Sequence, residues 1–456
     1  MTVTATGRHA APPVPAGPAA VPSAPRRRFA SLSTPSAMRA LLALLVLLSL
    51  AWGAVGGWVA IQHSTAADAV VNVDEPLSQD AATMYQKIAD ADATITASYL
   101  ANPEPQLIPL QRYQTDIKVA ITSLAALQAA AGSHADPAVR AALNEIGPGL
   151  NVYGGDIAEA KTEYAMGFPL TGGSFLQVAS EEAHVVLLPA AHTVYLKENA
   201  AVSAASSQAT ELPTLIAAIA VAVIVAIVLY RVQHWLTRRT NRMLSIGLGL
   251  ASVLLVVSTL WLAVGFLSAR ADLNRGIDHG SVPAENLALA SIDVQQIRGD
   301  AVLNVISRSG NASFQDDFES VSKIVGPGAN GGSLLDDAAA AQLPGSAGAT
   351  DLAAAKTDAT AWYAANTAVY TLGNASKYEL ERQSVIGTGP GSSAAGYATL
   401  EQNIQEANKS DQQVFTSAAT SGAHTLDPLA GVVIAAAILM ALASAWGITR
   451  RLAEYR

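Results

Sequence analysis

The sequence has no cysteine among its 456 residues. Disulfides, thiolate nucleophiles, Cys-ligated zinc and iron–sulfur clusters are therefore excluded. Aromatic residues make up only 5% and charged residues only 14% of the chain, although 51% of it is hydrophobic. The apolar content comes mostly from Ala, Leu, Val and Ile, which is more typical of long helices and membrane spans than of a large enzyme core.

Four long runs contain no Asp, Glu or Lys, and each is long enough to cross a hydrocarbon core, which takes about 20 residues in a helix. We predict transmembrane segments at residues 38–62, 212–230, 243–267 and 428–448. A cleaved signal peptide is the alternative interpretation of the first run, but that run exceeds the usual roughly 7–15 apolar residues, which favours an uncleaved anchor. No ionisable residue lies in the interior of a run, which disfavours a transporter or channel.

Charge is distributed unevenly along the chain. Twelve of the 27 basic residues lie in the N-terminal arm with the first span, in the short link after the second span, and in the C-terminal tail. These segments contain one acid, Glu454, whereas the other 35 of the 36 acids lie in the two long inter-span segments. The positive-inside rule predicts that both termini and the link are cytoplasmic and both long segments extracytoplasmic. The acidic outer segments also argue against nucleic-acid binding.

The predicted organisation follows from these segments. A Pro- and Ala-rich cytoplasmic arm (residues 1–37) cannot bury a core and is predicted to be disordered, serving as a topogenic tail or as a docking segment for a partner. The first outer domain covers residues 63–211, the basic cytoplasmic loop 231–242, the second outer domain 268–427 and the basic tail 449–456.

Apolar residues in the first outer segment recur at steps of three and four, which predicts helices. The first seam comprises Val70, Val73, Leu77, Met84, Ile88, Ala91, Ile95 and Ser98 and ends at Asn102–Pro105; the second comprises Tyr113, Ile117, Ile121 and Leu124. Asp136 before Pro137 predicts the start of a third helix. We expect Gly147–Gly149 to interrupt or bend that helix. A loop at Gly167–Gly173 is then expected before a fourth helix that starts near Ser174 and bends at Pro189.

The second outer segment shows the same plan, so each outer segment is predicted to be a four-helix bundle on two membrane helices. Its four helices are marked by Leu287, Ala290, Val294, Ile297, Ala301 and Asn304; by Phe314–Val325; by Leu352, Ala355, Ala359, Trp362, Asn366 and Val369; and by Tyr397, Leu400, Ile404, Ala407, Asp411, Val414 and Ala418. The fold class is therefore an all-α membrane protein with two tandem extracytoplasmic bundles.

Three short matches occur in the same order in both outer segments and indicate an internal duplication. They pair Ala91-Asp92-Ala93 with Gly299-Asp300-Ala301, Tyr113–Ile117 with Phe314–Phe318, and Ala158–Glu163 with Ala353–Asp358.

No catalytic or cofactor constellation stands out, and we predict no enzyme, no cofactor and no metal site. His184 and His192 with Glu181 and Glu182 lack HExxH spacing, so a metal site there is disfavoured. The Gly-rich runs lack the Lys-Ser/Thr of a phosphate loop.

Polar residues at apolar seam positions are the remaining candidates. Asn304, Asn366 and Asp411 either fix helix register or contact a ligand, and the structural interpretation is favoured. Recognition of an amino acid or dicarboxylate would require a cation, and the pattern does not choose among Arg112, Arg140, Arg298 and Arg382.

Paired bundles between membrane helices resemble bacterial chemoreceptor and histidine-kinase sensor domains, but no kinase or methyl-accepting helix follows the fourth span. Together with GFPLTGGSFLQVAS at Gly167–Ser180 and LLPAAHTVY at Leu187–Tyr195, this plan resembles the GlnX-type membrane proteins of actinobacteria. The resemblance implies a link between an extracytoplasmic lipoprotein that binds aspartate or glutamate and the cytoplasmic serine/threonine kinase G. It carries no functional residues over.

The prediction is a signal relay between partner proteins, acting by bundle rearrangement. A direct small-molecule sensor and a cell-envelope scaffold remain as alternatives. Predicted partners are membrane lipids, the lipoprotein and the kinase, with a homodimer as a further assembly.

Overall fold

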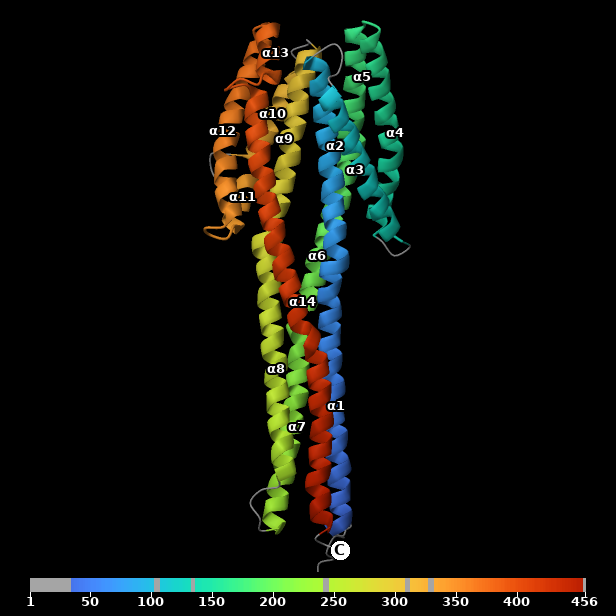
Figure 1. Cartoon of the computed structure of the whole chain (residues 1–456), viewed down its shortest axis with the longest axis vertical. Helices are drawn as coiled ribbons and strands as arrows, with labels where there is room; N and C mark the ends of the chain where they lie inside the picture. Colours follow the sequence, from blue (N-terminus) through green and yellow to red (C-terminus); the bar gives the residue numbers. More distant parts are fainter. Residues whose placement is uncertain are drawn as a thin grey trace, which may run out of the picture.

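The computed structural model describes residues 34–101, 107–132, 136–240, 246–307, 312–326 and 332–453. Most of the predicted N-terminal arm, the Asn102–Pro105 stretch and the end of the tail lie outside these ranges. The described chain is all-α, and its helices form one elongated body with bundles at one end and long parallel helices at the other (Figure 1).

Four long helical paths organise the molecule. The first runs through α1 (Thr34–Ala69), η1 (Val70–Asp74) and α2 (Glu75–Ala101), and the third runs through α8 (Ile246–Gly276), η3 (Ile277–Ser281) and α9 (Val282–Ser307). The second passes from α5 (Pro169–Glu182) through η2 (Ala183–Leu187) and α6 (Leu188–Ala209), breaks at Thr210, and resumes as α7 (Leu212–Thr240). The fourth is the single helix α14 (Ser393–Ala453) of 61 residues.

Each path contains a segment long and apolar enough to cross a membrane, so four candidate spans are present in the described residues. Large apolar side chains on these segments face outward, as lipid-facing residues do: Leu47 is 65% exposed, Ile216 61% and Leu442 61%. Small residues let the helices approach closely, since a Cβ added at Gly53 would lie 2.5 Å from the Ala437 Cβ. The chain is therefore a multi-pass membrane protein.

The first bundle is built from α2, α3 (Leu107–Ala130), α4 (Pro137–Ala165) and the α5–η2–α6 path. The predicted Asp136 cap is confirmed, because its carboxylate accepts a hydrogen bond from the Ala138 N–H at 2.8 Å. Of the two outcomes expected at Gly147–Gly149, an interruption is wrong, since α4 continues through Pro148. The expected Gly167–Gly173 loop is also too long, because α5 begins at Pro169, a residue well suited to a first helical position.

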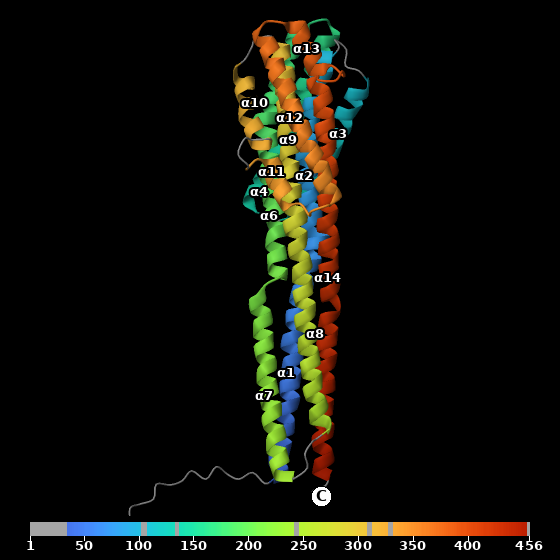
Figure 2. The same cartoon turned by 90° about the vertical axis from the view of Figure 1, so that its left-hand side faces the viewer.

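The second bundle uses α9, α12 (Ala347–Asn374) and α14, with α10 (Ala312–Val325), α11 (Leu334–Ala341) and α13 (Tyr378–Ile386) as shorter pieces. It stands beside the first bundle in Figure 1, and in Figure 2 its helices lie in front of the first bundle. The predicted seams of α9 and α12 are buried throughout. In the other predicted seams, Val73 (52%) and Ile121 (49%) are exposed. Four further positions are half-buried: Leu77, Tyr113, Ile117 and Val414.

Three turns of π-helix each precede a proline, and one of them contains the exposed Val73. η1, η2 and η3 each end two residues before a proline: Pro76, Pro189 and Pro283. Proline lacks an N–H and its ring collides with the carbonyl four residues earlier, so the helix locally widens to accept it. Val73 lies within the widened turn η1, where the α-helical spacing of the predicted seam does not hold, and its side chain is exposed.

Candidate functional site

The two bundles contact each other chiefly through α2 and α9, the first helix of each copy. This inter-bundle surface contains buried carboxyl groups, namely Asp90 (3% exposed), Asp92 (3%) and Asp300 (8%). Burying a carboxylate is costly unless a charged or hydrogen-bonding partner compensates. The partners therefore define what this surface does, and we call it the seam.

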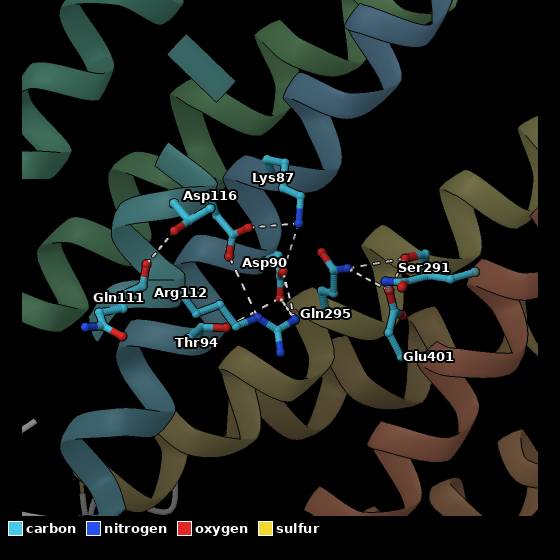
Figure 3. Close-up of polar contacts among 11 residues, drawn as sticks. Lys87, Asp90, Thr94, Gln111, Arg112, Asp116, Ser291, Gln295 and Glu401 are labelled. Carbon is cyan, nitrogen blue, oxygen red and sulfur yellow. Dashed lines mark hydrogen bonds and ion pairs between the residues drawn. The ribbon is translucent and has the colours of Figure 1, made fainter. Parts of the chain in front are cut away.

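Asp90 is the most strongly paired of the three. The Arg112 guanidinium from α3 donates to both carboxylate oxygens, at 2.8 and 2.9 Å, and Lys87 Nζ lies 3.4 Å away. Lys87 also pairs with Asp116 of α3 at 2.8 Å (Figure 3). Burial would raise the pKa of Asp90, but the charges of Arg112, Lys87 and Arg298 hold it below its usual value.

Arg298 brings the second bundle into this group. Its guanidinium lies 4.2 Å from the centroid of the Tyr397 ring, a cation–π contact between α9 and α14. Aligning Asp92 with Asp300 places Arg298 opposite Asp90 in the repeat. The two bundles thus have opposite charges at positions that the predicted repeat aligns, and these charges attract across the seam.

Glu401 of α14 completes the polar group on the second bundle. Its Oε1 accepts hydrogen bonds from Ser291 Oγ at 2.7 Å and from Gln295 Nε2 at 3.1 Å (Figure 3). Burial raises its pKa, and these hydrogen bonds only partly offset the effect. Three buried atoms at this place lack a hydrogen-bond partner within the described part of the chain: Glu401 Oε2, Gln295 Oε1 and the Tyr397 hydroxyl.

A second contact group joins both copies through His184. Its Nε2 lies 3.6 Å from Asp92 Oδ2 and its Nδ1 lies 3.8 Å from Asp300 Oδ1. Asp92 also accepts a hydrogen bond from Ser180 Oγ at 2.7 Å. Burial raises the pKa of Asp92, and it raises the pKa of Asp300 to about 7 despite the nearby imidazole. Two aspartates at matching positions of the predicted repeat therefore contact one histidine, which lies in the π turn η2.

The structure distinguishes among the four arginines that the sequence left open. Arg112 and Arg298 meet at the seam, whereas Arg140 is exposed and Arg382 pairs with Glu379 of its own helix at 3.3 Å. Arg112 pairs with Asp90, and Arg298 lies over the Tyr397 ring. Of these four arginines, Arg112 and Arg298 are therefore the ones placed to respond to a change between the bundles.

His184 and His192 do not share a site, because His192 packs against the Tyr85 ring at 5.6 Å between centroids. Across the described ranges, no three His, Asp or Glu residues are grouped so that they could hold a metal ion.

Each of the three polar residues predicted at otherwise apolar helix positions contacts another segment of the second bundle. Asn304 donates to Glu381 Oε1 at 3.0 Å, and Asn366 accepts from Ser393 Oγ at 2.6 Å. Asp411 accepts from Gln342. The Asn366 Nδ2 has no hydrogen-bond partner among the described residues. The structural interpretation of the three residues stays a prediction.

The sequence did not single out Asp90, Glu401 or the bridging role of His184. The available signal was the match of Asp92 with Asp300, which in the sequence alone indicates only a duplication. A buried acid at the same place in both copies was a hint that the copies meet there.

Fold and seam together define a multi-pass, all-α membrane protein in which two tandem bundles meet on buried charge. Residues 66–207 match the family model of the actinobacterial sensor domain. The matched stretch begins near the end of α1 and covers the whole first bundle, including Asp92 and His184. With the four membrane-length helices, it fits an actinobacterial sensor membrane protein, which confirms the predicted resemblance at that level. No curated protein and no solved structure matches the chain.

Proposed function

We propose that this protein relays an extracytoplasmic signal across the membrane through a rearrangement at the seam. The sensor-domain match supports a sensory or signalling role. The observation that carries the relay is helical continuity. The two helices that form the seam, α2 and α9, continue through η1 and η3 into the membrane helices α1 and α8.

Buried charge suits the seam to this role. Buried ion pairs contribute little net stability compared with apolar packing, because desolvation offsets their attraction. An interface of this kind has alternative arrangements of similar free energy, and a bound partner can select between them. A small shift of α2 against α9 is then transmitted along rigid helices to the far end of the spans.

The partners in this proposal come from the family resemblance. An extracytoplasmic lipoprotein that binds aspartate or glutamate would contact the bundles, and a cytoplasmic serine/threonine kinase would read the basic surfaces at the other end. The 12 basic residues of the arm, link and tail support placing that end in the cytoplasm. A homodimer in the membrane is compatible with this arrangement. The proposed role is not enzymatic.

Because the natural chain has no cysteine, paired spin labels can report on both ends of the full-length protein in lipid nanodiscs. One pair, Val152→Cys with Thr360→Cys, uses exposed positions on the two bundles; the other, Tyr230→Cys with Thr449→Cys, uses exposed positions at the basic end. The relay predicts that liganded lipoprotein shifts both label distances. In Arg298→Gln, only the outer pair should shift, because the cross-seam charge is lost.

Arg382→Gln is the matched control, since it removes an outer arginine that lies away from the seam. Unchanged distances at the basic end of the wild-type protein would contradict the relay and favour a scaffold. A shift with the free amino acid alone would favour direct sensing. A full shift in Arg298→Gln would show that the seam does not transmit the signal.

A further inference from the structure

A cavity lies where the two bundles approach the membrane helices, outside the seam. It has a volume of about 60 Å³ and is lined by residues of α2, α6, η3, α9 and α14. About 10–15 Å³ on this measure holds one water molecule, so the cavity accommodates a ligand of about four or five non-hydrogen atoms. Both copies of the repeat contribute to its wall.

Two glutamates give the cavity its charge. Glu75, which is 6% exposed, accepts hydrogen bonds at Oε1 from Gln79 Nε2 at 3.0 Å and from Thr416 Oγ1 at 2.6 Å. Glu285 accepts at Oε2 from Asn199. In the part of the chain that the structure describes, the other oxygen of each carboxylate accepts no hydrogen bond. Burial raises the pKa of both glutamates, and their hydrogen bonds only partly offset this.

Tyr195 gives an independent indication of a ligand. Its side chain is 4% exposed and lines the cavity, and its hydroxyl forms no hydrogen bond with the described residues. A cavity-lining residue whose hydroxyl has no protein partner keeps its capacity to accept a hydrogen bond. A ligand that donates a hydrogen bond would satisfy it.

The remaining walls define the class of ligand. No Lys, Arg or His side chain lines the cavity, whereas the Phe415 and Tyr195 rings do. A primary ammonium group carries a positive charge and three N–H donors. It can therefore meet two carboxylate oxygens and a hydroxyl, while aromatic faces attract the cation.

We propose that this cavity, bounded by Glu75, Glu285 and Tyr195, binds a small primary amine in its ammonium form. The site lies on the first turn of α2 and beside η3, the two points at which bundle helices join membrane helices. An occupied site would hold these two paths and α14 together. This inference does not depend on the proposed protein partners.

The test measures binding of ethanolamine to the full-length protein in nanodiscs by calorimetry at pH 7.5. We expect saturable binding with a Kd of about 1 mM or tighter, and no saturation by the neutral analogue ethylene glycol. Tetramethylammonium, which has the charge but no N–H donor, should bind at least about tenfold more weakly. Equal binding of either analogue, or no saturable ethanolamine binding up to about 10 mM, overturns the proposal.

Glu285→Gln should weaken ethanolamine binding at least about tenfold, because it removes one of the two charges. Glu198→Gln is the matched control: Glu198 is a half-buried acid on the same helix as Tyr195 but does not line the cavity. It should change the Kd less than about threefold. Ala284→Leu places a larger side chain in the wall and should abolish binding while circular dichroism stays unchanged. Wild-type affinity in both Glu285→Gln and Ala284→Leu would show that the amine binds elsewhere.

Discussion

Asp300→Asn tests the electrostatics of the seam directly. Burial raises the pKa of Asp300 to about 7 in the fold, against an ordinary value of 3.8. Between these two values the folded protein keeps a proton that the unfolded chain loses. Stability therefore falls as pH rises through this window, and the loss is complete above about pH 7.

The magnitude follows from the width of the window. Within the window, the free energy of unfolding falls by about 1.4 kcal/mol per pH unit. The interval from 3.8 to about 7 therefore corresponds to a loss of about 4 kcal/mol, of which about 2–3 kcal/mol falls between pH 5 and pH 8. Asparagine has a similar shape but cannot ionise. The stability of Asp300→Asn relative to wild type should therefore rise by about 2–3 kcal/mol from pH 5 to pH 8.

Urea unfolding of the full-length protein in detergent micelles, followed by circular dichroism, provides the assay. Other acids with raised pKa values, such as Asp411, contribute equally to both proteins and cancel in the difference. Asp316→Asn, at an exposed position of α10, removes the same formal charge away from the seam and is the control for the loss of one charge. A difference for Asp300→Asn that does not change with pH would refute the claim that this acid is buried and largely protonated.

Three further predictions concern packing and pairing. Asp90→Asn should destabilise the protein at pH 7 by about 1–2 kcal/mol, because Arg112 and Lys87 lose a buried carboxylate partner but both stay partly solvated. Urea unfolding measures this loss, and no measurable loss would contradict the pairing. The same loss should shrink as pH falls through the lowered pKa of Asp90. Trp362→Ala should cost about 3–5 kcal/mol, since Trp362 is 0% exposed in the second bundle, whereas exposed Trp446→Ala should cost far less. Gly247→Val should loosen the packing of α8 on α14, because a Cβ there would overlap the backbone at Ala443 and Gly447. The yield of disulfides between cysteines introduced into α8 and α14 should then fall. An unchanged yield would contradict this packing.

The sequence by itself determined the four membrane helices, the helical bundles and most of their buried faces. These features depend on local periodicity and composition, which can be read without knowing what packs against what. The apolar face of α12 from Leu352 to Val369 is buried as predicted. The same reasoning placed Ile121 inward, although the adjacent Ala120 and Leu124 define the buried face of α3.

Local signals also misjudged the effect of proline and glycine inside helices. Pro148 and Gly149 were expected to interrupt α4, yet Gly149 packs against Leu187 and the helix continues. Tertiary contacts here outweigh the helix-breaking tendency. A π turn accommodates each of three further helix prolines: Pro76, Pro189 and Pro283. The positions of these turns depend on the surrounding packing.

Only the tertiary structure decided where the two copies meet. Nothing in the spacing of Asp92, His184 and Asp300 shows that one imidazole lies between both aspartates, since these residues are far apart in the chain and on three different helices. Likewise, only the tertiary structure places two of the four candidate arginines, Arg112 and Arg298, between the bundles. Hydrophobic periodicity specifies which face of a helix is buried, but the pairing of charges across two buried faces depends on their relative placement in space.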